Sequence, residues 1–220
     1  MVRRRRKWLP MNATIENVSK SRAPAKRKTA NDNARDRILF AATDLFCRYG
    51  ISATGIDAIV DAAGTAKATL YNTFGSKEGL VEAVLKAEGL AWREWFFLEL
   101  DKLRGQPADK LVAIFSILEK WFAQERFFGC PFINAVGEFD KRDARYRKIA
   151  LSHKAIVLER LTAMAREAGA AKPAKTAHEL GLLIDGAIVA AMVTGDPKVA
   201  RHAKSAARKM VEGLKTQPAE

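Results

Sequence analysis

Residues 54–80 read TGIDAIVDAAGTAKATLYNTFGSKEGL, and this stretch decides the fold. Its apolar residues recur at helical spacing in two short runs, 56–63 and about 67–73, which are separated by a tight turn at Gly64. Thr54 and Asp57 have the spacing of a capping signature, so we expect Thr54 to cap the first of these helices. Two short helices joined by a tight turn are the layout of a helix-turn-helix.

The rest of the chain from Asn33 onward also has helical spacing, without a convincing period-2 strand pattern. A longer helix ends at Gly50 before the stretch, and Ser76 is a suitable N-cap for a long helix after it. Later helices, separated by glycine and proline, are expected near 111–122, 146–169, 173–194 and 197–214. The sequence therefore predicts an all-α fold.

The segment 35–81 resembles the TetR family of transcriptional regulators. RILFAATDLFCRYG (37–50) is similar to the first helix of that family, TGIDAIVDAAG (54–64) to the second, and TAKATLYNTFGSKEGL (65–80) to the recognition helix and the start of the fourth. The resemblance implies a sequence-specific DNA-binding regulator, usually a repressor that a small-molecule effector releases from its operator. We therefore expect an N-terminal three-helix helix-turn-helix domain at 31–77 and a C-terminal helical ligand-binding and dimerisation domain at 78–215, behind a disordered basic arm at 1–30.

Three positions in the recognition region depart from the usual family pattern. Ala66 stands where serine is common, Ala68 where glycine is common, and Thr73 where histidine or tyrosine is common. Without a serine at 66, Thr65 is the remaining candidate to cap the recognition helix. These departures leave the operator sequence open.

DNA contacts are expected from the recognition helix and its flanks. Lys67 and Thr69 belong to the helix end that points at base edges in the major groove, and Tyr71 and Asn72 can donate to phosphates or bases. Lys77 begins the long helix, where free N–H groups and the helix dipole favour a phosphate. The alternative is that such side chains are only solvated. The full set of DNA-binding candidates is Thr54, Thr65, Lys67, Ala68, Thr69, Tyr71, Asn72 and Lys77.

The segment 180–193 is apolar on every face, so the helix that contains it must be covered all round. Its own core supplies part of that cover, and we expect a second copy of the chain to supply the rest. The family resemblance also implies a dimer formed by the last two helices; the alternative is a buried core helix in a monomer. Interface candidates are Leu180, Ile184, Ile188, Ala191, Ala203 and Met210.

The middle of the chain, between 92 and 139, is rich in tryptophan and phenylalanine. Each aromatic alone is explained by core packing, but the family resemblance implies an effector pocket here, and aromatic walls favour an apolar or aromatic ligand. Polar residues among them are candidates to orient it. The ligand-binding candidates are Trp92, Trp95, Phe96, Phe115, Trp121, Phe132, Asn134 and His153.

The net charge of +13 is concentrated in residues 1–30, which hold ten Lys and Arg against the single acid Glu16. This net of +9 leaves only +4 for the rest, so global charge is weak evidence for DNA binding by the folded part. The arm is either a disordered leader, with Met11 as an alternative start, or a tether to phosphates or the minor groove.

Other classes find little support in the sequence. Cys47 and Cys130 belong to no C-x-x-C pair, which indicates neither a disulfide framework nor a zinc site, and we expect no metal and no cofactor. No secretion signal or uninterrupted apolar run of eighteen residues is present, so a cytoplasmic protein at the nucleoid is predicted. The chain lacks the H-E-x-x-H, G-x-S-x-G and P-loop patterns, so we expect no enzyme, although spacing alone leaves a Cys130–histidine pair open. The third class is an architectural or purely protein-interacting module on the same fold, which would bind DNA only weakly and without sequence preference.

Overall fold

The computed structural model describes residues 30–139 and 144–214. Within these ranges the chain forms helices and no strands, which confirms the all-α prediction. The predicted basic arm, apart from its last residue, lies outside the described residues. The helices are α1 (Ala30–Tyr49), α2 (Ile56–Ala63), α3 (Lys67–Phe74), α4 (Lys77–Asp101), α5 (Pro107–Phe122), α6 (Pro131–Glu138), α7 (Arg145–Glu167), α8 (Pro173–Thr194) and α9 (Val199–Leu214).

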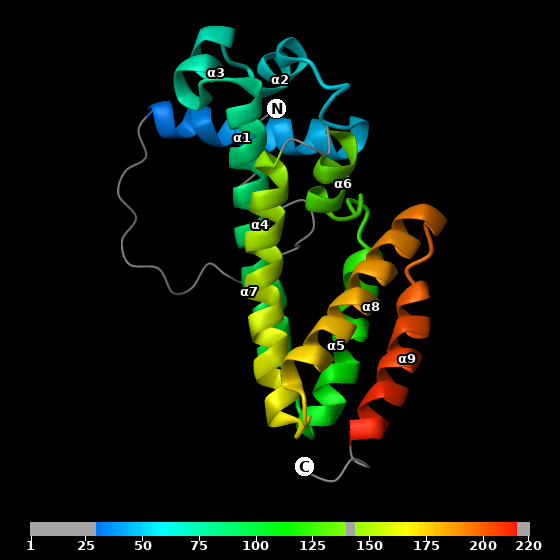
Figure 1. The fold of residues 1–220 in the computed structure, drawn as a ribbon. Coiled ribbons are helices and arrows are strands. Elements are labelled where there is room, and N and C mark those ends of the chain that lie inside the picture. The colour runs from blue at the N-terminus through cyan, green and yellow to red at the C-terminus, as the bar shows by residue number, and fades with distance from the viewer. Residues whose placement is uncertain (1–29, 140–143, 215–220) are drawn as a thin grey trace.

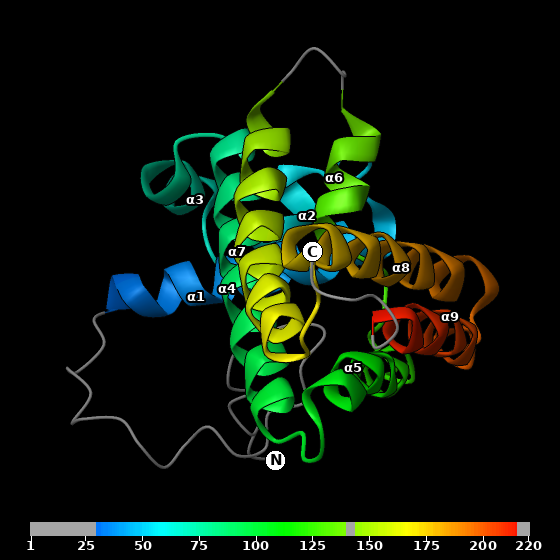
Figure 2. The same ribbon diagram turned by 60° about the horizontal axis from the view of Figure 1, so that its bottom comes forward.

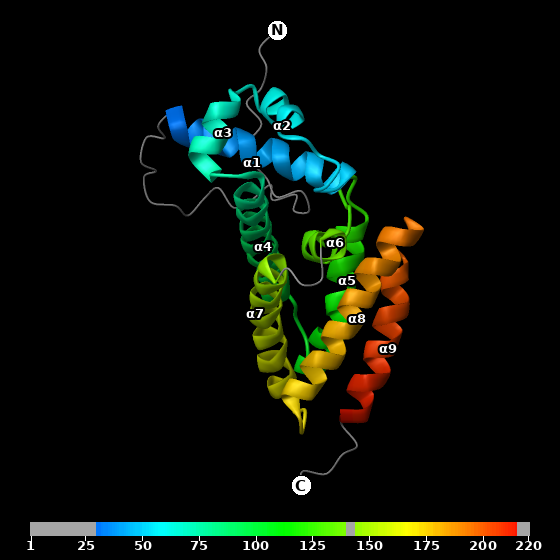
Figure 3. The same ribbon diagram turned by 45° about the horizontal axis from the view of Figure 1, so that its top comes forward.

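The molecule has a small head and a longer body (Figure 1). Helices α1, α2 and α3 form the head, and α4 runs from the head down one side of the body beside α7. Helices α5, α8 and α9 form the other side of the body, with α9 packed mainly on α5 (Figures 2 and 3). The short helix α6 lies between head and body.

The head is closed by local capping and a small core. Gly64 ends α2 in the left-handed conformation at φ 59°, which a glycine adopts without a Cβ penalty. The Ser76 hydroxyl accepts a hydrogen bond from the Gly79 amide at 3.1 Å, which confirms Ser76 as the N-cap of α4. Ile38, Ile59 and Leu70 come from α1, α2 and α3 and are fully buried together.

The body core is aromatic and aliphatic. Phe96 of α4 and Phe115 and Trp121 of α5 are among its largest buried side chains. Helix α8 is long and apolar enough to cross a membrane, but one helix with this length and composition is weak evidence for a membrane span. Because α8 packs against α7 and α9 and pairs its Asp185 with Lys154 of α7, we interpret it as a core helix.

Candidate functional site

Helix α3 presents a polar face to solvent. Lys67, Tyr71 and Asn72 are exposed, as is Ala68, whereas Leu70 on the opposite face is buried in the head. The remaining DNA-binding candidates around this helix, Thr65, Thr69 and Lys77, are half-buried. The predicted recognition helix therefore offers its donor side chains on one accessible surface.

Two of the expected caps are wrong. The Thr54 side chain is buried and its hydroxyl donates back to the Gly50 carbonyl at 2.6 Å, so it closes the turn after α1 and no side chain caps α2. The N-cap of α3 is Ala66, again without a side-chain cap, and Thr65 contributes only its amide, which donates to the Val60 carbonyl. Both first turns therefore keep free backbone N–H groups near the exposed face.

Charged residues outside the predicted set organise the head surface. Asp57 of α2 forms an ion pair with Lys67 at 2.9 Å, and this hydrogen-bonded carboxylate raises the pKa of Lys67. Arg37 of α1 donates from Nε to the Ala63 carbonyl at 3.0 Å, which ties α1 to the end of α2. The ion pair and the tie join residues that lie far apart along the chain, so no local pattern indicates them.

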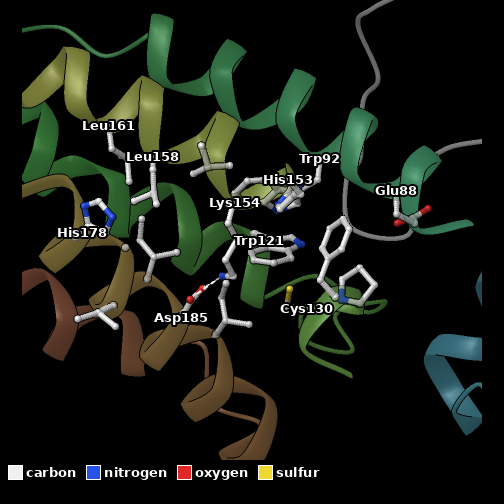
Figure 4. A pocket seen from close by; sticks show the side chains of 17 residues that line it. Glu88, Trp92, Trp121, Cys130, His153, Lys154, Leu158, Leu161, His178 and Asp185 are labelled. Carbon is white, nitrogen blue, oxygen red and sulfur yellow. Dashed lines mark hydrogen bonds and ion pairs between the residues drawn. The ribbon is translucent and has the colours of Figure 1, made fainter. Parts of the chain in front are cut away.

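A cavity of about 230 Å³ lies in the body between α4, α6, α7 and α8, with Trp121 of α5 in its wall (Figure 4). It is larger than the cavity of about 150 Å³ that holds one benzene molecule. Its lining comprises Glu88, Trp92, Trp121, Cys130, Pro131, Phe132, His153, Lys154, Val157, Leu158, Leu161, His178, Gly181, Leu182, Ile184, Asp185 and Ile188.

Half of the predicted ligand-binding residues line this cavity, namely Trp92, Trp121, Phe132 and His153. The other half do not. Trp95, Phe96 and Phe115 are buried core residues, and the Phe96 ring stacks behind Trp92 at 4.6 Å between centroids. Asn134 donates its side-chain amide to the Phe128 carbonyl at 3.2 Å and so holds the chain before α6.

His153 is held as a neutral ring. An Arg93 guanidinium nitrogen lies 2.9 Å from Nδ1, and since a guanidinium can only donate, Nδ1 accepts and the ring proton sits on Nε2. The pKa of His153 is lowered to about 3, mainly by burial and also by the positive charges of Arg93 and Lys154. The ring stacks on Phe132 at 4.2 Å.

Gly89 of α4 allows this stack to approach the helix backbone. A Cβ atom at position 89 would lie 2.7 Å from Phe132 Cζ, which is closer than real Cβ atoms come, and 3.1 Å from His153 Nδ1, which is a tight contact. Because Gly89 has no side chain, Phe132 of α6 and His153 of α7 pack directly against the backbone of α4. The cavity wall at this end depends on the glycine.

The charged pair in the cavity wall was not predicted from the sequence. Lys154 of α7 donates to both carboxylate oxygens of Asp185 of α8, at 2.6 Å for Oδ2. A signal was available, because Lys154 lies on one helical stripe with Val157, Leu158 and Leu161, and an ionic residue on an apolar stripe marks a polar group in a buried wall.

The thiol of Cys130 also lines the cavity, but it is not an activated nucleophile. Burial raises the pKa of Cys130, which keeps it protonated at neutral pH. The pKa of Cys47 is raised to about 12, again mainly by burial. Among the described residues no group of three or more His, Cys, Asp and Glu side chains could hold a metal ion.

Helix α6 joins the cavity to the head. Its first residues, Pro131 and Phe132, line the cavity, and its last residue, Glu138, accepts from the amides of Ile51 at 3.1 Å and Ser52 at 2.8 Å. A second link lies just before α6.

In this second link Arg126 pairs with Asp44 of α1, and its guanidinium lies over the Phe40 ring. Glu138 thus ties the turn between α1 and α2 to the helix that forms one cavity wall, and Arg126 ties α1 to the segment before that helix.

The apolar surface of α8 differs from the predicted interface. Leu180, Ile184, Ile188 and Ala191 are at most 5% exposed because they pack inside their own chain, and Ala203 and Met210 of α9 are partly buried against the same core. The choice of the four α8 residues needs correction, since buried side chains offer no surface to a partner, whereas Ala203 and Met210 stay predictions. The large apolar side chains of α8 that are exposed are Leu182, Val189, Met192 and Val193.

Comparison with known proteins places this arrangement in a family. The head matches the model "Bacterial regulatory proteins, tetR family" over residues 38–84, and the body matches "Tetracyclin repressor-like, C-terminal domain" over residues 107–207. The chain belongs to the TetR family of transcriptional regulators.

Individual relatives agree with the family assignment. A TetR-family regulator from Streptomyces coelicolor superposes with a TM-score of 0.74 and 26% identity, covering 86% of this chain and 97% of its own. The transcriptional repressor KstR2 of Mycolicibacterium smegmatis is 35% identical over 81 residues, 37% of this chain and 39% of its own. The transcriptional activator FasR of the same organism is 44% identical over 55 residues, 25% of each chain. The matches span less than two thirds of these two curated relatives.

Proposed function

We propose that the protein is a transcriptional repressor that binds operator DNA as a homodimer and is released by a small apolar effector bound in the body cavity. It would act in the cytoplasm, at the nucleoid. The observation that carries this proposal is α6, because one short helix lines the cavity at its start and holds the head by Glu138 at its end.

DNA binding is proposed for the exposed face of α3 and its flanks. Lys67, Tyr71 and Asn72 supply donors for base edges or phosphates, and Thr65, Ala68 and Thr69 lie close enough along the helix for the groove to reach them. Lys77 at the first position of α4 adds a charge where free amides already favour a phosphate. Thr54 is buried, so its contribution is to shape the turn.

The dimer is proposed to form through the outward face of α8 with α9. Leu182 and Val193 are 72% and 75% exposed, and Val189 lies between them on the same helical face. Gly186, also on this face, has no atom within 4 Å of a Cβ position and leaves room for a partner helix. A second copy would cover an apolar stripe that water otherwise meets.

Effector control follows if the ligand favours one arrangement of α6 over another. Operator affinity then changes only by the ratio of ligand affinities for the two arrangements. Because Glu138 accepts hydrogen bonds from the Ile51 and Ser52 amides, a shift of α6 would also move the turn between α1 and α2.

The same mechanism of effector control serves a repressor or an activator of transcription. KstR2 is named a repressor and FasR an activator, and both resemble this chain. A reporter placed behind the protected DNA decides between them: repression predicts that expression falls when the protein is supplied.

Footprinting on the DNA upstream of the protein's own gene tests the central claim. We expect a protected, nearly palindromic site whose half-sites lie about 34–36 Å apart, one turn of B-DNA. Weak binding that is independent of sequence would instead indicate an architectural module and would overturn the proposal.

A further inference from the structure

The polar groups of the cavity are mostly hydrogen-bond donors. His153 carries its ring proton on Nε2, since Nδ1 accepts from Arg93. The indole N–H groups of Trp92 and Trp121, two lining residues, have no hydrogen-bond partner among the described residues. A buried donor without an acceptor is costly, so a ligand whose acceptor oxygens reach these groups matches the lining better than one that supplies further donors.

Lys154 adds a third kind of donor. An ammonium group has three N–H donors, and Asp185 occupies two of them with its two carboxylate oxygens. Figure 4 shows this ion pair beside Trp121, at the middle of the cavity. One charged donor therefore remains on a residue that lines the space.

The charges near His153 favour an anionic ligand over a cationic one. Aromatic walls such as Trp92 and Phe132 would suit either an apolar acid or an organic cation. However, the charges that act on His153 come from Arg93 and Lys154, and both are positive. Among the described residues Arg93 has a hydrogen bond to the neutral His153 and none to a carboxylate, although the charge of the neighbouring Glu94 also acts on it.

The acidic lining residues do not cancel this preference. Asp185 is already paired with Lys154, and Glu88 lies at the far end of the cavity from that pair (Figure 4). A carboxylate placed between His153 and Lys154 would meet donors from both residues. The apolar remainder of the ligand would then lie against Val157, Leu158 and Leu161.

We propose that the effector is an apolar carboxylic acid whose carboxylate binds between His153 and Lys154. This inference rests on the proposed function, because it names the class of ligand for the same cavity. The volume of about 230 Å³ suits a bicyclic aromatic acid or a medium-chain fatty acid better than a single ring.

The test is a calorimetric titration of the full chain with matched probes. Naphthalene-2-carboxylate and octanoate are each compared with the corresponding primary amide and the corresponding primary amine. A hydrogen bond to a charged group predicts that the better-fitting carboxylate binds about tenfold or more tightly than its amide, and more tightly still than its amine. Equal affinities, a preference for the amine, or no binding by either carboxylate overturns the proposal.

Variants locate the carboxylate. Lys154→Met should remove the preference for acid over amide, and His153→Phe should weaken it while keeping the stack on Phe132. Because Lys154→Met leaves Asp185 unpaired, the double variant Lys154→Met/Asp185→Leu is measured beside it, and thermal unfolding shows which variants remain folded. A folded double variant that still prefers the acid tenfold contradicts the assignment of Lys154.

Operator binding is measured separately on the same samples. A probe amide that binds and releases DNA while the acids do not would refute the acid and leave the proposed function standing. A carboxylate that binds with the expected preference but leaves operator affinity unchanged at saturation would support the ligand class and refute effector control.

Discussion

Two neighbouring residues of α8 provide a direct test of the proposed dimer. Ile188 is 4% exposed and packs inside its own chain, whereas Val189 is 39% exposed on the outward stripe. An unpaired carboxylate at 188 would cost about 3–5 kcal/mol, a large part of the roughly 5–15 kcal/mol that holds a typical domain folded. The same carboxylate at 189 reaches water in a monomer, where a surface change costs at most about 0.5 kcal/mol.

In a twofold dimer the substitution at 189 occurs twice. If each buried carboxylate costs only about 2 kcal/mol, the pair costs about 4 kcal/mol and raises the dimer dissociation constant roughly 700-fold. Light scattering at micromolar concentration should therefore give twice 24.3 kDa for the parent chain and 24.3 kDa for a folded Val189→Glu variant. Circular dichroism should show Ile188→Glu losing thermal stability. A Val189→Glu protein that is folded and dimeric, or a parent chain that is monomeric, would refute the assignment of this face.

Three further predictions concern the head, its link to the cavity and pH. Lys77→Ala should weaken binding to every DNA sequence and make the salt dependence shallower by about one unit per lost phosphate contact, whereas Lys67→Ala should mainly change sequence preference; the reverse pattern in binding titrations would contradict these roles. Glu138→Ala should reduce the ratio of operator affinities measured without and with effector, while Glu138→Gln, which keeps one acceptor oxygen, should retain more of it. His153 is neutral in the folded chain because its pKa is lowered to about 3, so between about pH 3 and 6.5 only the unfolded chain binds the extra proton. The free energy of unfolding, measured by denaturant titration, should therefore fall by up to about 2 kcal/mol from pH 7 to pH 5. A His153→Phe variant whose free energy of unfolding falls equally over this pH range would rule this out.

The helices could be predicted from the sequence because their signals are local. Apolar spacing, Ser76 and Gly64 place α1–α4, and Pro173 marks the start of α8, whereas the helix expected near 111–122 begins earlier, at Pro107. Helix α6 was missed as an element because it is only two turns long. A proline soon after a glycine, as at Gly129 and Pro131, is typical of a break between helices, but Pro131 is also the first residue of α6.

The site was predicted less fully, since it depends on which helix faces meet. Sequence spacing cannot separate Trp92, which lines the cavity, from Phe96 four residues later, which is buried behind it. A helix that is apolar all round does not reveal which side its own chain covers, and this explains the correction at Ile188. Pairs such as Lys154 and Asp185 lie 31 residues apart and become visible only when α7 and α8 pack.

The contact between Glu138 and the head involves the amides of Ile51 and Ser52, not their side chains. A carboxylate that holds backbone N–H groups is indifferent to which residues supply them, provided that the turn keeps its shape and neither position 51 nor position 52 is proline. The recognition helix α3 takes no part in this contact. Substitutions on α3 can therefore change the operator that is read without disturbing the link to α6, so DNA specificity and effector response are free to evolve, or to be engineered, separately.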